Sequence, residues 1–202
     1  MILITAPVRD QGTAFLKRGK EVWQWVPSIQ RMIKIPPSLM GQSWMGSDFT
    51  HDDLVKEVSL VRDYSHRFLA DTVLNERRVY RVEMIPRPEA PIVWDKVILW
   101  VAHEGWVQQR SEFFDESGHR VYCLYMDEFQ KIGSRWVPMA LRMVPDNKPQ
   151  TRTEIRYTSI QYDIPLKESF FSLHRLRSLS MGNMFENQIM TLGALPASPK
   201  GW

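Results

Sequence analysis

The residues that come closest to a catalytic motif are Gly41, Ser43 and Gly46, in the segment Gly-Gln-Ser-Trp-Met-Gly. A serine nucleophile elbow has the pattern G-x-S-x-G, in which a sharp turn after a parallel strand exposes the hydroxyl group. Here the second glycine follows the serine by three residues instead of two, and no parallel-sheet pattern precedes it. We therefore interpret Ser43 as a small residue in a packed helix, and we predict no catalytic residue.

Metal-ligating side chains are present, but their spacing does not predict a metal site. A helical zinc site pairs two histidines four residues apart, and none of the five histidines forms such a pair or sits beside the single cysteine, Cys123. Asp48, Asp52 and Asp53 lack the spacing of a calcium-binding hand. Thr50 and Asp53 instead fit a helix capping box, which opens a short helix through about residue 56. We predict neither a metal nor a cofactor.

Nucleic-acid binding is not predicted either. Proteins that hold single strands combine a positively charged groove with stacking aromatic side chains. Arginines do cluster at 77–81, 152–156 and 175–177, but Glu76, Glu83 and Glu154 interrupt the pattern. The net charge of +3 is too small to argue for such a partner. We interpret these arginines as the solvated faces of strands.

Large apolar side chains are concentrated between residues 22 and 54. This stretch holds three of the eight tryptophans, together with three methionines and the pair Pro36-Pro37. Methionine adapts to varied apolar partners, and aromatic rings supply large apolar area at low entropic cost. Two interpretations stay open: an ordinary hydrophobic core, or a cavity for a hydrophobic ligand. The candidate cavity residues are Trp23, Trp25, Met32, Leu39, Met40, Trp44, Met45 and Phe49, with Trp94, Ile98 and Trp100 from an opposing sheet.

The hydrophobic pattern predicts a mostly β protein. Strands are expected at 21–26 and 31–35, and Pro36-Pro37 then leads into a short helical segment at 38–45, which would act as a lid. Tyr80, Val82 and Met84 alternate with charged residues and indicate a one-sided strand. Residues 94–101 are apolar on both faces, with Trp94, Ile98 and Trp100 on one of them.

Turn signals divide the remaining chain into antiparallel hairpins. Strands at 66–74 and 78–85 flank Asn75-Glu76, and strands at 119–131 and 135–144 meet at Gly133-Ser134. A further strand is expected at 151–162. Eight to ten strands with few helices predict a large curved antiparallel sheet that forms an incomplete, half-open barrel with short helices as a lid.

Length and composition predict one globular domain. The chain has 202 residues, with 44% hydrophobic and 24% charged residues, which are ordinary values for a folded domain. We expect this domain to span residues 1–176 and residues 177–202 to form a mobile tail, with a helical turn near 184–190. No apolar run approaches the ~20 residues that span a membrane. The first residues do not form the hydrophobic segment of a signal peptide.

One long segment is similar to a known family. The sequence GTAFLKRGKEVWQWVPSIQRMIKIPPSLMGQSWMGSDFTHDDLVKE resembles the LolA-like outer-membrane lipoprotein-sorting proteins, in the branch encoded beside large transport permeases. Looser similarity extends through Pro86-Arg87-Pro88, Val93-Trp94 and Val144-Pro145 to Phe170-Phe171-Ser172-Leu173. The resemblance implies an incomplete barrel with helices across its open face, a periplasmic location and a resistance-nodulation permease as partner.

Members of that family carry a signal peptide, a helix and initial strands before the matching segment. We expect this chain to lack that part, which would expose a sheet edge, weaken ligand binding or allow a homodimer. Two functional hypotheses follow. The first is a non-enzymatic periplasmic carrier that binds a lipid, or the acyl chains of a lipoprotein, in an apolar cavity. The second is an interaction module that docks on an envelope permease without a small ligand.

Overall fold

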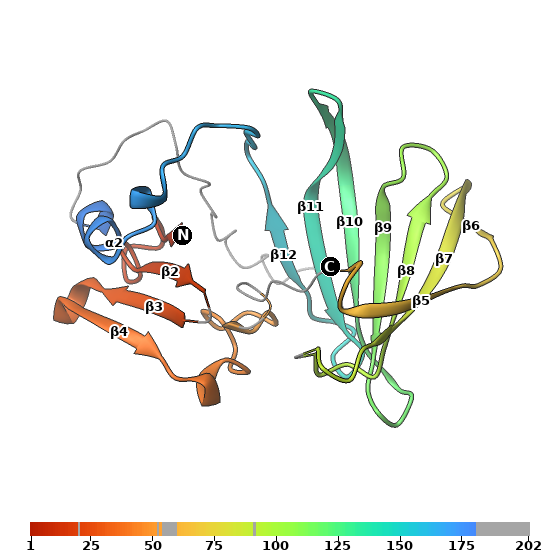
Figure 1. Cartoon of the computed structure of the whole chain (residues 1–202), viewed down its shortest axis with the longest axis horizontal. Helices are drawn as coiled ribbons and strands as arrows, with labels where there is room; N and C mark the ends of the chain where they lie inside the picture. The colour runs from red at the N-terminus through yellow and green to blue at the C-terminus, as the bar shows by residue number, and fades with distance from the viewer. Residues whose placement is uncertain (20, 52, 54–59, 91, 181–202) are drawn as a thin grey trace. The chain divides into compact units, whose positions relative to one another are not determined.

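The computed structural model describes every residue except 20, 52, 54–59, 91 and 181–202. The described chain forms two compact units (Figure 1). The first unit joins Met1–Gln42 to the segment that begins at Ile155, and the second is Ser43–Glu154. Among the described residues, no helix has the length and hydrophobicity needed to cross a membrane.

The first unit contains a four-stranded antiparallel sheet in the order β1-β2-β3-β4. Its strands are β1 (Ile2–Leu3), β2 (Ala14–Arg18), β3 (Glu21–Val26) and β4 (Arg31–Ile35), and its helix is α2 (Leu173–Ser180). Short 3-10 turns lie at Pro27–Ile29, Pro37–Leu39 and Glu168–Phe170. The predicted strands at 21–26 and 31–35 are therefore confirmed.

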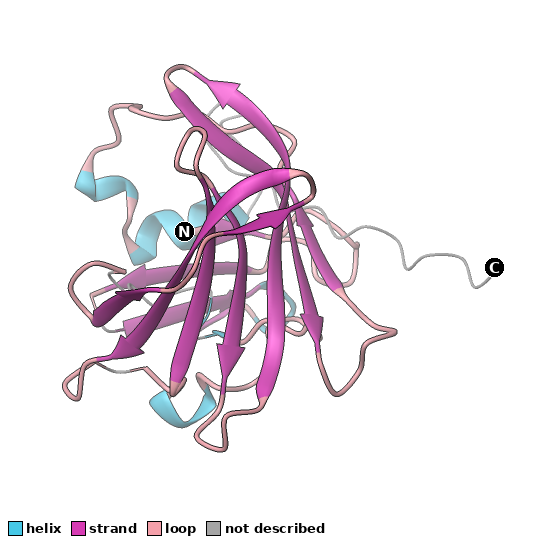
Figure 2. Ribbon diagram, turned by 90° about the vertical axis from the view of Figure 1, so that its right-hand side faces the viewer, coloured by secondary structure: helices cyan, strands magenta, loops and turns pink. Residues whose placement is uncertain are grey.

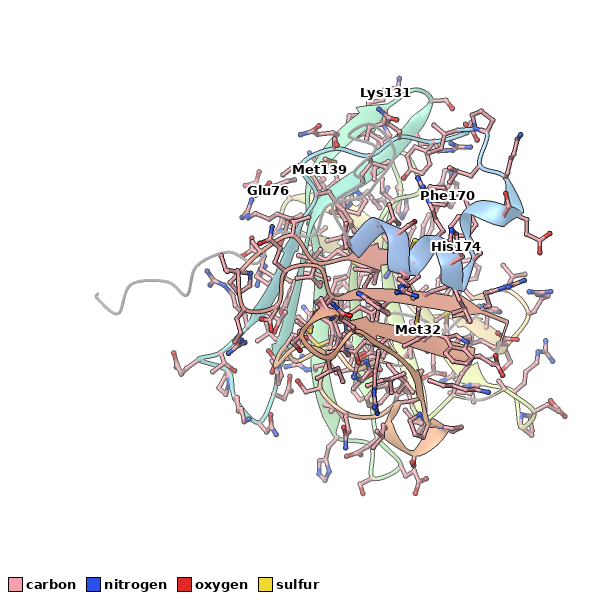
Figure 3. The ribbon with its side chains drawn as sticks, turned by 90° about the vertical axis from the view of Figure 1, so that its left-hand side faces the viewer. Met32, Glu76, Lys131, Met139, Phe170 and His174 are labelled. Carbon is pink, nitrogen blue, oxygen red and sulfur yellow. The ribbon has the colours of Figure 1, made fainter. Side chains whose placement is uncertain are left out.

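Helix α2 lies across one face of this sheet, as Figure 3 shows with His174 on the helix and Met32 on β4. Leu176 and Leu179 pack against Leu16 and Trp25 in a buried cluster. The hydroxyl oxygen of Ser172 accepts a hydrogen bond of 3.2 Å from the backbone N–H of Arg175 and so caps the first turn of α2.

The second unit contains most of an eight-stranded antiparallel sheet (Figure 2). The strand order is β12-β11-β10-β9-β8-β7-β5, and β6 also pairs with β7. The strands are β5 (Tyr64–Phe68), β6 (Thr72–Leu74), β7 (Arg77–Pro86), β8 (Lys96–Ala102), β9 (Gln108–Phe114), β10 (Arg120–Ile132), β11 (Arg135–Pro145) and β12 (Thr153–Arg156). The mostly β, antiparallel fold class is confirmed.

Both predicted hairpins are present. Leu74 pairs with Arg77 across Asn75-Glu76, and Ile132 pairs with Arg135 across the second turn. Other strand limits differ from the prediction. The strand expected at 66–74 is divided into β5 and β6, and the strand expected at 151–162 is only β12. The predicted end of the domain at residue 176 falls inside α2, and the predicted helical turn near 184–190 lies outside the described residues.

The predicted helix at 38–45 was wrong for most of its length. Only a single 3-10 turn at Pro37–Leu39 is present. Beyond it, Met45 and Gly46 have φ of 53° and 77°, which a right-handed helix does not allow. These two residues instead close a turn, in which the backbone N–H of Trp44 donates a 2.7 Å hydrogen bond to the carbonyl of Phe49.

The β6–β7 turn gives a first prediction. Asn75 and Glu76 have φ of 49° and 64°, a conformation in which glycine is favoured at the second position. Replacing Glu76 by glycine should therefore stabilise the protein by about 0.5–1 kcal/mol, because it removes the left-handed strain of a residue with a Cβ atom. Urea denaturation measures the change. As a control, Glu89→Gly, at a position without a positive φ, should not stabilise; an equal gain in both variants would contradict this explanation.

Candidate functional site

The two faces of the eight-stranded sheet have opposite chemistry. The cross-strand register places two rows of mainly apolar residues on one face, which we call the apolar face. The first row is Val82, Leu99, Ser111, Leu124 and Met143, and the second is Met84, Val97, Phe113 and Tyr122. The other face, which we call the charged face, carries a row of alternating arginines and aromatic residues: Arg81, Trp100, Arg110, Tyr125 and Arg142.

The apolar face has a buried centre. Met84 and Val97 are 1% and 2% exposed, and they pack with the ring of Tyr64. Trp94 packs against this cluster together with Leu99. Around this centre, Val82, Leu99 and Leu124 are only partly buried, so this face keeps apolar area in contact with solvent.

An aromatic cluster borders the buried centre. The rings of Phe113 and Tyr122 stack at a centroid distance of 4.3 Å, and Trp94 meets them edge-on at 5.6 and 5.3 Å. Burial, the main cause, and the nearby Asp53 carboxylate raise the pKa of Tyr122 far above its usual value. Its phenol therefore stays neutral, which suits contact with an uncharged apolar ligand.

The charged face is held by cation–π contacts between neighbouring strands. The guanidinium of Arg110 lies 5.1 Å from the ring centroid of Trp100 and 5.3 Å from that of Tyr125. Arg81 lies 5.5 Å from the Trp100 ring, and Arg142 lies 4.4 Å from the Tyr125 ring. These contacts cover the aromatic rings with cations, so this row does not offer an apolar surface.

Glu112 anchors the same face. Although the residue is only 8% exposed, its carboxylate accepts a 3.1 Å hydrogen bond from the Trp100 indole N–H. It also pairs with the guanidiniums of Arg110 and Arg120, the second at 3.3 Å, while Arg120 reaches Asp146 at 2.9 Å. A buried carboxylate with three donors is satisfied, and this arrangement points to a structural role.

In the first unit, the predicted cavity residues are divided between a core and the surface. Trp25 is 4% exposed and belongs to the cluster beneath α2, where Trp23 and Met32 pack at its margin. All three lie on the same face of the four-stranded sheet. Trp25 pairs with Met32 on the neighbouring strand, and Trp23 is two residues from Trp25 along β3. Leu39 lies exposed in a 3-10 turn, and Met40 follows it.

In the second unit, Trp44 and Phe49 are buried, whereas Met45 is exposed. The expectation that Trp94, Ile98 and Trp100 share a face is correct for Ile98 and Trp100 and wrong for Trp94. Trp94 precedes β8, so the alternation of that strand does not extend to it, and its ring packs on the apolar face. Ile98 lies opposite Glu83 and Glu112 on the charged face, and Trp100 belongs to the arginine row.

Sequence reasoning did not single out Phe113, Tyr122 and Leu124 as candidate residues. A weaker signal was available, since every residue of β10 from Val121 to Met126 is apolar, although this run does not distinguish the two faces of the strand. Their alignment with β9, however, depends on pairing between strands. β10 also carries an irregularity in its pairing with β9 between Arg120 and Tyr122.

The acidic residues near position 50 organise the local backbone. The predicted capping box is confirmed: Thr50 N–H donates to the Asp53 carboxylate at 2.8 Å, and Asp53 N–H donates to the Thr50 hydroxyl at 3.1 Å. Asp48 bonds instead to Thr153 of β12, whose hydroxyl lies 2.6 Å from the carboxylate.

Asp52 and most of the helix expected after the capping box lie outside the described residues. In the described part of the chain, no group of three or more His, Cys, Asp or Glu side chains is placed to hold a metal ion.

A protein-family model whose description reads "Uncharacterized protein" matches residues 1–178. The chain belongs to this family. Its fold is LolA-like, because three solved structures share it. A Vibrio parahaemolyticus domain named as an outer membrane lipoprotein-sorting protein aligns with a TM-score of 0.73 and 22% identity, over 87% of this chain and 75% of its own. No curated protein matches the chain in sequence.

The other two structures support the same fold. A DUF1329 family protein from Desulfovibrio piger aligns with a TM-score of 0.77 and 19% identity, covering 86% of this chain and 75% of its own. A LolA superfamily protein from Nitrosomonas europaea aligns with a TM-score of 0.66 and 21% identity, covering 86% and 76%. The predicted LolA-like architecture is therefore confirmed at the level of the fold.

Proposed function

We propose that this protein is a non-enzymatic carrier of the cell envelope, which binds a lipid or the acyl chains of a lipoprotein in the periplasm. The observation that carries the proposal is the one-sided apolar face of the eight-stranded sheet. Its half-buried Val82, Leu99 and Leu124 continue a buried centre formed by Met84 and Val97. The LolA-like fold of a neighbour named for lipoprotein sorting supports the same function.

An acyl chain fits this face for a simple energetic reason. Removing one CH₂ group from water contributes roughly 0.8 kcal/mol, so burying about ten of them contributes on the order of 8 kcal/mol before ordering costs. Binding of this kind needs no directional bond, which suits a surface of aliphatic and aromatic side chains. Among the residues predicted from sequence, we retain Trp94 for this surface and exclude Ile98 and Trp100, which lie on the charged face.

The remaining predicted residues keep their proposed roles as parts of a cavity wall or lid. We propose that Trp44 and Phe49 line an apolar cavity of the second unit, with Met45 at its margin. Within the first unit taken by itself, we propose an apolar wall or lid formed by Trp23, Met32, Leu39 and Met40. Trp25 contributes indirectly, by holding the packing beneath α2.

Uptake of a fluorescent fatty acid by the delipidated protein tests the proposal. We expect saturable binding of one molecule per chain. Leu99→Gln should weaken it about tenfold, because an amide on the apolar face opposes burial by roughly 1.4 kcal/mol. The matched control is Ile98→Gln, the neighbouring half-buried residue on the charged face, which should leave the affinity within about twofold.

Thermal unfolding must show that both variants fold before their affinities are compared. Equal weakening by both variants would show that the apolar face is not the site. Native mass spectrometry of the purified protein, followed by lipid extraction, identifies a co-purifying cargo. A clean apo mass with no fatty-acid uptake would overturn the carrier.

A second candidate function is a docking module for an envelope permease of the resistance-nodulation type. An exposed aromatic patch favours it: Phe68 and Trp106 are 73% and 71% exposed, and their rings lie 6.0 and 5.4 Å from that of Tyr80. Such patches often mark interaction surfaces. A docking module would take up no fatty acid, so the same assay separates the two functions. A homodimer through a sheet edge stays a prediction.

A further inference from the structure

The first unit contains a pocket that shares Trp23 with the proposed apolar wall and adds charged groups that the carrier function does not use. Its volume is about 560 Å³, and it lies between the adjoining ends of β2 and β3 and the segment that leads into α2. The lining residues are Arg18, Gly19, Glu21, Trp23, Glu168, Phe171 and Leu173. This volume is within the range of pockets that hold one small molecule.

The lining has an apolar part and charged groups of both signs. Trp23, Phe171 and Leu173 supply the apolar part and pack against the core beneath α2, so they rest on a fixed support. Arg18 supplies a guanidinium and Glu168 a carboxylate. A guanidinium matches the geometry of a phosphate, and a carboxylate or an aromatic ring attracts an ammonium group.

The neighbourhood of Trp23 shows how an ammonium group is held here. The ammonium of Lys34 lies 5.7 Å from the Trp23 ring centroid and forms an ion pair with Glu21. Hydrogen bonding from Lys34, its charge and a bond from the Trp23 indole together lower the pKa of Glu21. The charged form of Glu21 is therefore favoured, and its carboxylate lies beside both Lys34 and the Trp23 indole.

We propose that this pocket binds the zwitterionic head of an amphiphile, such as a phosphoethanolamine group, with the phosphate on Arg18 and the ammonium between Glu168 and the Trp23 ring. Phe171 and Leu173 contact the first carbons of the attached chain. Since Lys34 already neutralises Glu21, the described lining residues leave one charge of each sign for a ligand, which matches a zwitterion better than a pure anion or cation. This site lies in the first unit and does not depend on the carrier function of the sheet in the second.

A soluble short-chain lipid tests the site. Dihexanoyl phosphatidylethanolamine is titrated, below its critical micelle concentration, into ¹⁵N-labelled protein. The readout is the indole N–H resonance of Trp23, which is assigned by its loss in the Trp23→Phe variant. We expect a saturable shift. Arg18→Gln and Glu168→Gln should each weaken binding about tenfold, as expected for the loss of one charge-assisted contact. Arg31→Gln, an exposed charge on β4 outside the pocket, should leave it unchanged.

Headgroup specificity distinguishes this proposal from general lipid affinity. Dihexanoyl phosphatidylglycerol lacks the ammonium group. It should bind the unaltered protein at least about fivefold more weakly than the phosphatidylethanolamine does, whereas the Glu168→Gln variant should bind the two lipids equally. Equal binding of both lipids to the unaltered protein, or no shift of the Trp23 resonance, would overturn the proposal. Fatty-acid uptake by the apolar face is measured separately with Leu99→Gln, so failure of one site does not imply failure of the other.

Discussion

Replacing Glu112 by alanine is expected to destabilise the Ser43–Glu154 unit by about 3–5 kcal/mol. The carboxylate is buried and holds Arg110, Arg120 and the Trp100 indole at once. Its removal leaves the Arg110 guanidinium, which is 16% exposed, without its closest counter-charge. The cost comes mainly from that uncompensated charge, because solvent cannot reach it freely.

Urea denaturation followed by circular dichroism measures this loss. Glu112→Gln separates the effect of charge from that of hydrogen bonding, because the amide oxygen can still accept a hydrogen bond from the Trp100 indole. We expect this variant to lose less stability than Glu112→Ala. Asp127→Ala is the matched control. Asp127 pairs with Arg142, but its carboxylate is 44% exposed, and exposed ion pairs contribute only about 0–1 kcal/mol to the free energy of unfolding. A loss below about 1 kcal/mol for Glu112→Ala would show that Arg110 finds another partner and would refute the anchoring role.

Replacing Leu176 by alanine should cost about 2–5 kcal/mol in the first unit. This side chain is fully buried in α2 and packs with Leu16 and Trp25, neither of which has room to close the resulting cavity without moving the sheet. The same change should broaden the Trp23 indole resonance, because Phe171 and Leu173 reach the pocket from the segment that α2 holds in place.

His174 provides the control for this second experiment. It lies exposed on the same helix, as Figure 3 shows, so His174→Ala should change stability by less than about 0.5 kcal/mol. Urea denaturation and the Trp23 resonance are recorded for both variants. If Leu176→Ala unfolds at the same urea concentration as the unaltered protein, the packing of α2 does not stabilise this unit.

The two sheet faces, with their opposite chemistry, would contribute differently to the proposed carrier function. On the charged face, the arginines and aromatic rings contact one another through cation–π interactions. An acyl chain would therefore gain little binding free energy there. The apolar face keeps partly exposed aliphatic side chains and a neutral Tyr122. A carrier built on this sheet would therefore bind cargo on one face only, which the Leu99 and Ile98 variants test directly.

Features that depend on a few neighbouring residues could be predicted from the sequence. The alternation of Val82 and Met84 with Arg81 identified the one-sided strand β7, and Asn75-Glu76 identified its turn. The capping box of Thr50 and Asp53 was also predicted correctly. Each of these follows from local backbone geometry, in which the side-chain period and the turn conformation are set by adjacent residues. The long family-like segment added the LolA-like fold, which the comparisons confirmed.

The distribution of the tryptophans and methionines over the structure could be decided only by tertiary contacts. Trp25 became a core residue because α2, from the far end of the described chain, covers it. Trp94 and Trp100, six positions apart, lie on opposite faces because strand β8 begins between them. The five-residue row from Arg81 to Arg142 requires the mutual register of five strands. Register and helix docking minimise the free energy of the whole fold, and no single stretch of sequence contains that information.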